Sequence, residues 1–126
     1  MTKIFIITLT AFFMTSSLSI ASNDNPSIHA AVMMNDFNLA NYYLRNGGKI
    51  DAVNNKGGTA LMLATELCKD KFVEYLISKG ANTCAQNPQG HTAIDYACSQ
   101  QVVNVIKKNQ EAAGCKLNKS LGSSVK

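Results

Sequence analysis

An internal repeat is the strongest constraint that this sequence places on its own fold. The segment GGTALMLA begins at Gly57, and the similar segment GHTAIDYA begins at Gly90. Four of the eight aligned positions are identical, and the same offset places Gly47 on Gly80. A period of roughly 20 to 50 residues is typical of a stack in which each unit buries its apolar face against its neighbours. The sequence therefore predicts an array of similar units.

Each unit contains two short segments with helical periodicity. In the second unit the apolar residues recur at helical spacing in two runs: Leu61, Leu63, Ala64 and Leu67, then Phe72, Val73, Leu76 and Ile77. Gly80 follows the second run, where glycine favours the end of a helix. Residues 82–91 are rich in Asn, Gly and Pro, as a turn-bearing finger requires. We therefore expect two antiparallel helices and a hairpin finger in each unit.

The repeated residues resemble the signature T-P-L-H-x-A of the ankyrin repeat family, whose period of about 33 residues is also the offset between the two segments. Residues 59–64 (TALMLA) and 92–97 (TAIDYA) are similar to the whole signature, and residues 28–31 (IHAA) match its L-H-x-A portion. The resemblance implies an all-α repeat solenoid, built from stacked helix-turn-helix units with hairpin fingers. It implies about three repeats, near residues 25–57, 58–90 and 91–109.

The sequence departs from the family pattern in ways that bear on local geometry. Alanine replaces the signature proline at Ala60 and Ala93, and the signature histidine is kept only at His29. Asp70 stands at a position that is usually apolar. In the third unit the second helix aligns too early for the repeat register, so the loop between its helices is expected to lack three residues.

The residues 1–21 predict a secretory signal peptide. Lys3 precedes an apolar run over residues 4–14, and small residues lead to a cleavage site after Ala21. An uncleaved membrane anchor is the alternative, but the run is shorter than the ~20 residues that span a bilayer. We expect the mature protein to be periplasmic or secreted and of bacterial type, with its repeat domain at residues 22–109.

Residues 110–126 are expected to form a basic C-terminal tail. The chain has a formal net charge of +4. Residues 107–126 hold one acidic side chain, Glu111, and five lysines: Lys107, Lys108, Lys116, Lys119 and Lys126. Such a tail is typically a solvated end, although it can attract an anionic membrane surface. Export argues against nucleic acid as the partner.

The four cysteines, Cys68, Cys84, Cys98 and Cys115, are an even number in a compartment that permits disulfides, and three pairings are possible. The repeat register that the resemblance implies favours Cys68–Cys98 with Cys84–Cys115. Equivalent positions in adjacent repeats lie about 10 Å apart, whereas a bridge requires Cα atoms within ~7 Å, so a local shift is needed. The other pairings and free thiols remain open.

No constellation of residues in the sequence points to catalysis. His91 is near Cys98 and Ser99, but it belongs to a finger while Cys98 belongs to the helix stack, so no activated nucleophile is expected. Gly57 and Gly58 are turn residues rather than a phosphate-binding loop. The chain has no C-x-x-C and no histidine at zinc-ligand spacing. We therefore expect no enzyme activity, metal, cofactor or small-molecule substrate.

Similarity to ankyrin proteins implies that a partner protein of unknown identity is bound on the concave face, by finger tips and the exposed end of each first helix. The implied helix positions are Met33, Met34, Glu66, Leu67, Ser99 and Gln100, and the finger positions are Val53, Asn55, Lys56, Gly58, Gln86, Pro88, Gln89 and His91. Met33 and Met34 beside Leu67 would form an adaptable apolar patch. The alternative is that Met33 and Leu67 cap the core.

These expectations favour an exported protein–protein interaction module. It would inhibit a periplasmic enzyme, as an immunity protein does, or support one. Two alternatives remain: a secreted effector that binds a host protein, and an envelope tether that uses the basic tail on anionic lipid.

Overall fold

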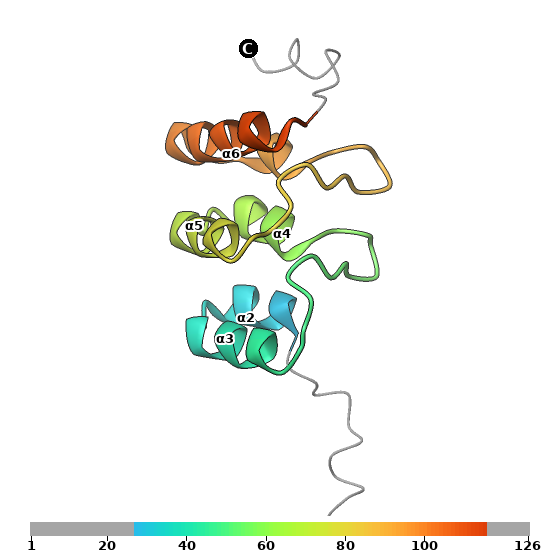
Figure 1. Ribbon diagram of the computed structural model, residues 1–126, viewed down its shortest axis with the longest axis vertical. Helices are drawn as coiled ribbons and strands as arrows, with labels where there is room; N and C mark the ends of the chain where they lie inside the picture. The colour runs from blue at the N-terminus through green and yellow to red at the C-terminus, as the bar shows by residue number, and fades with distance from the viewer. Residues whose placement is uncertain (1–26, 116–126) are drawn as a thin grey trace, which may run out of the picture.

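The structure is a computed structural model that describes residues 27–115. Its helices form three layers stacked along one axis (Figure 1). The layers hold α2 (Ile28–Met34) with α3 (Phe37–Arg45), α4 (Ala60–Glu66) with α5 (Asp70–Ser78), and the 3-10 helix η2 (Ala93–Tyr96) with α6 (Gln100–Ala113). The all-α repeat stack expected from the sequence is confirmed. The expected signal peptide, at residues 1–21, and residues 116–126 of the tail lie outside the described residues.

Hydroxyl and carboxylate side chains cap the N-termini of most of the described helices. The Thr59 hydroxyl accepts a hydrogen bond from the Met62 N–H over 3.3 Å, and Asp36 Oδ1 accepts from two N–H groups of α3 over 2.9 and 3.0 Å. Ser27 and Ser99 cap α2 and α6 in the same way. The first N–H groups of a helix have no partner within it, so these contacts stabilise each helix start. The threonine of the repeated signature is therefore a capping residue.

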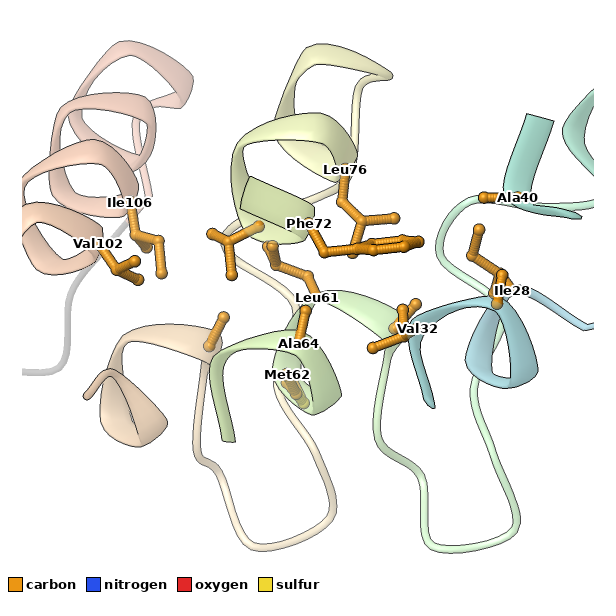
Figure 2. Packing of buried hydrophobic residues seen from close by; sticks show 14 residues of the cluster. Ile28, Val32, Ala40, Leu61, Met62, Ala64, Phe72, Leu76, Val102 and Ile106 are labelled. Atoms are coloured by element: carbon orange, nitrogen blue, oxygen red, sulfur yellow. The ribbon is translucent and has the colours of Figure 1, made fainter. Parts of the chain in front are cut away.

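One apolar core runs through all three layers (Figure 2). Ile28 from the first layer, Phe72 from the second and Ile106 from the third are fully buried. Phe37 stacks on Phe72 across the first interface between layers, with ring centroids 4.6 Å apart. A single repeat has little core of its own, so burial between layers is the main source of stability.

Small residues allow neighbouring layers to approach closely. Ala31 and Ala64 occupy the same register of the repeat and are fully buried. A larger side chain at either position would overpack the contact between helices. Ala97, in the same register of the third unit, is only half-buried, because η2 ends at Tyr96 before reaching it.

The first helix of the third unit differs from its counterparts. Helices α2 and α4 each span seven residues, whereas η2 is a 3-10 helix of four. Ala97 then has an extended backbone, and α6 begins at Gln100. The loop that lacks three residues explains the change, since a full first helix would leave no chain for the connection. Helix α6 runs to Ala113, so residues 110–113, assigned to the tail from the sequence, form its last turn.

Two hairpin fingers project to the same side of the stack (Figure 1). Finger 1 comprises residues 52–58 and finger 2 comprises residues 85–91. In finger 1, Asn54 Oδ1 accepts hydrogen bonds from the N–H groups two and four residues further on, over 2.9 and 3.0 Å. Asn87 makes the same two bonds in finger 2, over 3.0 and 2.9 Å. Each finger therefore carries its own turn-stabilising side chain.

Two disulfide bonds join the second and third units. Cys68 pairs with Cys98 and Cys84 with Cys115, at Cα separations of 5.6 and 5.7 Å. This is the pairing that the repeat register favours. The early end of η2 supplies the local shift for the first bridge, since the extended chain at Ala97 leads directly to Cys98. Cys68 has a φ of +55°, the left-handed conformation that Asn35 adopts at the equivalent position of the first unit.

Candidate protein-binding groove

A groove with a volume of about 410 Å³ lies between the two fingers and the helices beneath them. It is termed the finger groove, and its lining residues are Asn54, Lys56, Gly58, Thr59, Met62, Leu63, Glu66, Asn87, Gln89 and Tyr96. These residues come from finger 1, finger 2, α4 and η2. The repeat places these elements side by side, because each finger leads into the first helix of the next layer.

The finger groove combines apolar and charged groups. Met62, almost fully buried, and Leu63, half-buried, contribute apolar surface from α4. Lys56 and Gln89 are exposed on the fingers, and Glu66 is exposed at the end of α4. Apolar surface flanked by a few polar groups is typical of a binding site, in which the polar groups fix the orientation of the ligand. The groove suits a protein segment with an apolar side chain between polar ones.

Tyr96 ties finger 2 to η2 at the wall of the groove. Its hydroxyl accepts a hydrogen bond from Asn87 Nδ2 over 2.7 Å and lies 3.3 Å from His91 Nδ1. The His91 and Tyr96 rings meet edge to face, with centroids 5.8 Å apart. Tyr96 was not among the residues expected at the binding face, although it occupies the register of Leu63 in the next repeat and this register could have indicated it. His91 supports the wall of the groove in this arrangement.

The fingers hold most of the residues expected at the binding face. Lys56, Gly58 and Gln89 line the groove together with Glu66 of α4. Further finger residues are exposed outside the lining: Val53, Asn55, Gln86 and Pro88. The Pro88 ring packs closely over Gly57, where an added Cβ would lie 2.5 Å from Pro88 Cδ. The two fingers therefore contact each other through a proline and a glycine.

Exposed apolar side chains lie outside the groove lining, at the ends of α2 and α4 and on finger 1. Met33 and Met34 at the end of α2 are 66% and 70% exposed, and Leu67 at the end of α4 is 44% exposed. Val53 on finger 1 is 62% exposed. Lys69 Nζ donates a hydrogen bond to the Met33 carbonyl oxygen over 3.0 Å, which links the ends of the two helices. These exposures do not fit the alternative that Met33 and Leu67 cap the core.

Ser99 and Gln100 do not lie at the end of a first helix, and that part of the expectation is wrong. Ser99 is the N-cap of α6, where its hydroxyl accepts from the Val102 N–H over 3.2 Å and donates to Asp70 Oδ2 over 3.0 Å. Gln100 is the first residue of α6. The carry-over assumed a first helix of full length, which the shortened third unit does not have. Asp70, at a position that is usually apolar, therefore has a hydrogen-bond partner in the Ser99 hydroxyl.

Cys98 and Ser99, two residues that could supply a nucleophile, have structural roles. Cys98 is bonded to Cys68, and the Ser99 hydroxyl is used in capping. Within residues 27–115, no three His, Cys, Asp or Glu side chains lie close enough together to form a metal site.

Burial raises the pKa of Tyr75, whose hydroxyl donates to Asn41 Oδ1 over 2.8 Å. None of the helices in this part of the chain is both long and apolar enough to cross a bilayer.

Stacked helical hairpins with fingers around a polar and apolar groove define a repeat solenoid of the kind that binds other proteins. A family model described as ankyrin repeats, in three copies, matches residues 28–119. The chain therefore belongs to the ankyrin repeat family. Ankyrin repeats imply a protein–protein interaction module, and members of the family are usually non-catalytic.

Proposed function

We propose that the protein is exported and binds one partner protein in the finger groove and on the apolar side chains around it. Through this contact it inhibits a periplasmic enzyme, as an immunity protein does, or supports one. The observation that carries the proposal is the groove itself, which two fingers, α4 and η2 build from polar and apolar side chains. The partner would insert a protruding segment between the fingers.

The construction of the fingers supports this proposal. Asn54 and Asn87 hold the two turns through side-chain hydrogen bonds, and Pro88 packs over Gly57 between the fingers. A surface that is ordered before binding loses less conformational entropy when the complex forms. The exposed side chains are therefore presented on a frame that does not need to fold around the partner.

The exposed apolar side chains supply the energy that such a contact needs. Met33, Met34, Val53 and Leu67 are all exposed, at the ends of α2 and α4 and on finger 1. Few residues in an interface contribute most of the binding free energy, and they are the ones that become fully desolvated. Methionine adapts its shape to the surface it meets. We expect Leu67 and the two methionines to be the main anchors, and Lys56 and Glu66 to set orientation.

Export is supported by the cysteines as well as by residues 1–21. Both disulfides join structural units of the stack, and disulfides persist in oxidising compartments such as the periplasm. A partner in the same compartment is the simplest consequence. A secreted effector would meet the same oxidising conditions outside the cell, so the source of the captured partner distinguishes the two roles.

The test is affinity capture from envelope and secreted fractions of the source organism with immobilised residues 22–126. Leu67→Arg places a charge beside the groove, and Tyr42→Arg is its matched control, because Tyr42 is an exposed apolar residue on α3, 59% exposed. We expect the unchanged protein and Tyr42→Arg to retain the same protein and Leu67→Arg to lose it. Equal unfolding midpoints in urea show that both variants are folded.

Capture that is equal in all three proteins, or lost in Tyr42→Arg but kept in Leu67→Arg, would overturn the assignment of the groove. A truncation after Cys115 separates the tether alternative, because it removes lysines 116, 119 and 126 without disturbing α6 or the second disulfide. A tether would lose its affinity for anionic vesicles in this truncation, whereas a groove binder would keep its partner.

A further inference from the structure

The two disulfides differ in their exposure to solvent. Cys68 and Cys98 are both exposed, whereas Cys84 and Cys115 are half-buried. The second bridge lies next to the buried pair Thr83 and Gln110, which are joined by a hydrogen bond of 2.9 Å from Gln110 Nε2 to the Thr83 carbonyl oxygen. Thiol–disulfide exchange requires a thiolate to reach a sulfur atom, so access favours reaction at Cys68–Cys98.

Loop length does not distinguish the two bridges. The paired cysteines are separated by 30 and 31 residues in the sequence. The entropy that a disulfide removes from the unfolded chain depends weakly on loop length, so both bridges restrict that chain to nearly the same extent. Access and the local backbone are therefore the features in which they differ.

The backbone at Cys68 adds a second difference. Its φ of +55° lies in the left-handed region, which a residue with a Cβ atom adopts at a cost in free energy. The equivalent residue of the first unit is Asn35, and asparagine tolerates this conformation better than cysteine does. The exposed bridge therefore contains a cysteine at a position that the fold would fill better with asparagine or glycine.

The exposed bridge is close in the sequence to one wall of the finger groove. It connects the end of α4 to Cys98, two residues after Tyr96. A 3-10 helix of four residues is too short to be stable alone, so η2 depends on its attachments. Tyr96 in turn is bonded to Asn87 of finger 2. The bridge, η2, Tyr96 and finger 2 thus form one connected series that ends in the groove.

We propose that the Cys68–Cys98 disulfide is a redox switch for the shape of the finger groove, opened by a dithiol reductant while Cys84–Cys115 keeps the third unit attached. A thiolate of the reductant attacks one Sγ, and the other Sγ leaves as a thiolate that takes up a proton. The second thiolate of the reductant then resolves the mixed disulfide. Two electrons reach the cysteine pair, and the reductant becomes a disulfide.

Opening the bridge leaves residues 97–99 attached to the second unit through Ser99 Oγ, which donates to Asp70, and through Cys98 Sγ, which lies 3.4 Å from the Thr65 carbonyl oxygen. Tyr96 and finger 2 then move apart from α4 more easily, so the groove loses its fixed width. The consequence for a bound partner rests on the proposed function. The change in the groove does not, because it can be measured in the free protein.

The experiment uses residues 22–126 equilibrated at graded ratios of reduced to oxidised dithiothreitol, followed by alkylation and peptide mapping. We expect Cys68 and Cys98 to be alkylated at a ratio about tenfold lower than Cys84 and Cys115, a difference of about 30 mV. Simultaneous reduction of both bridges, or earlier reduction of Cys84–Cys115, would overturn the proposal.

Amide hydrogen exchange measures how often the backbone near the groove opens. It is compared between the oxidised protein, the reduced protein and the double variant Cys68→Ser with Cys98→Ser. The Ala97 N–H, which donates to Ile94, and the His91 N–H, which donates to Asn87 Oδ1, should exchange at least about tenfold faster. The Val73 N–H within α5 is the internal control and should not change. Unchanged exchange at Ala97 and His91 would contradict the switch, whether or not the capture experiment finds a partner.

Discussion

His29 Nε2 donates a hydrogen bond to the carbonyl oxygen of Gly58 over 3.0 Å and so joins α2 of the first layer to the end of finger 1. A carbonyl oxygen only accepts, so Nε2 carries the proton in this contact. The signature histidine thus links two repeats, although the other units have lost it. Gly58 also lines the finger groove, and the bond fixes one of its edges.

Replacing this histidine is expected to weaken the stack. His29→Ala should lower the free energy of unfolding by about 1 kcal/mol, because the half-buried bond is lost and the Gly58 carbonyl must find water instead. Urea unfolding followed by circular dichroism measures the change. His91→Ala is the comparison and should cost less, because Tyr96 keeps its hydrogen bond from Asn87. An equal loss of unfolding free energy in both variants would show that the hydrogen bond from His29 to Gly58 contributes no more to stability than the contact of His91 does.

The start of α6 should be sensitive to a single hydroxyl. Ser99→Ala removes the cap on the Val102 N–H and the hydrogen bond to Asp70, so we expect a loss of about 1 to 2 kcal/mol in unfolding free energy. Gln100→Ala, at the exposed neighbouring position, should change stability by less than about 0.5 kcal/mol. Thermal and urea unfolding of the two variants decide the matter, and similar losses would argue against the cap.

The buried amide of Gln110 gives a prediction that depends on pH. Gln110 is fully buried, its Nε2 donates to the Thr83 carbonyl oxygen, and its Oε1 has no hydrogen-bond partner among residues 27–115. In Gln110→Glu, burial should raise the pKa of the new carboxyl above its ordinary value, because the charged form is disfavoured. Only the protonated carboxyl can donate to Thr83 as the amide does.

The sign of this effect follows from proton binding. Between the unfolded and the raised folded pKa, the folded state of Gln110→Glu binds more protons than the unfolded state, so stability falls as pH rises through this interval. Urea unfolding at pH 5 and pH 8 should therefore show the variant most weakened at the higher pH. Gln86→Glu, on an exposed finger position, is the control and should show little of this dependence. The same pH profile in both variants would refute buried titration.

The contact between the fingers can be isolated with a pair of glycine substitutions. Gly57 and Gly90 have φ values of +78° and +82°, so alanine is strained at both. Of these two glycines, Gly57 is the one whose added Cβ would meet another group, namely the Pro88 ring, because nothing lies within 4 Å of a Cβ at Gly90. We expect Gly90→Ala to cost about 1 kcal/mol from backbone strain, and Gly57→Ala to cost more.

Pro88→Ala should recover part of the additional loss when it is combined with Gly57→Ala, and it should not recover the loss in Gly90→Ala. A double-mutant cycle from urea unfolding measures this coupling. If the two single glycine variants are equally stable, the close packing of Pro88 over Gly57 has no energetic consequence.

The repeat explains how much of this fold could be predicted from the sequence. Thr59 recurs as Thr92, and both are the N-cap of a first helix, while Ala31 recurs as Ala64 in a close contact between helices, so periodicity indicates the stack. The same register favours the observed cysteine pairing without excluding the others, since Cys68–Cys98 and Cys84–Cys115 both join adjacent units.

Features that depend on the departures from the repeat were harder to predict. Three missing residues change the first helix of the third unit into η2, and this change moves Ser99 from an expected binding face to a helix cap. Tyr96 shares the register of Leu63, which also lines the groove, but its hydrogen bond from Asn87 of finger 2 has no signal in the repeat. Gln110 was expected to belong to the tail, but α6 continues to Ala113 and Gln110 is fully buried. Such effects arise from contacts between elements, which periodicity does not describe.

The side-chain hydrogen bonds of Asn54 and Asn87 have a consequence for how this protein can evolve. Each asparagine holds its finger by bonding to backbone groups, so the bonds do not depend on which side chains the bonded residues carry. Positions such as Asn55, Lys56 and Gln89 can then accept new side chains while the turn keeps its shape. Descendants of this chain could change partners by mutation at a few finger positions, with the helical stack inherited unchanged.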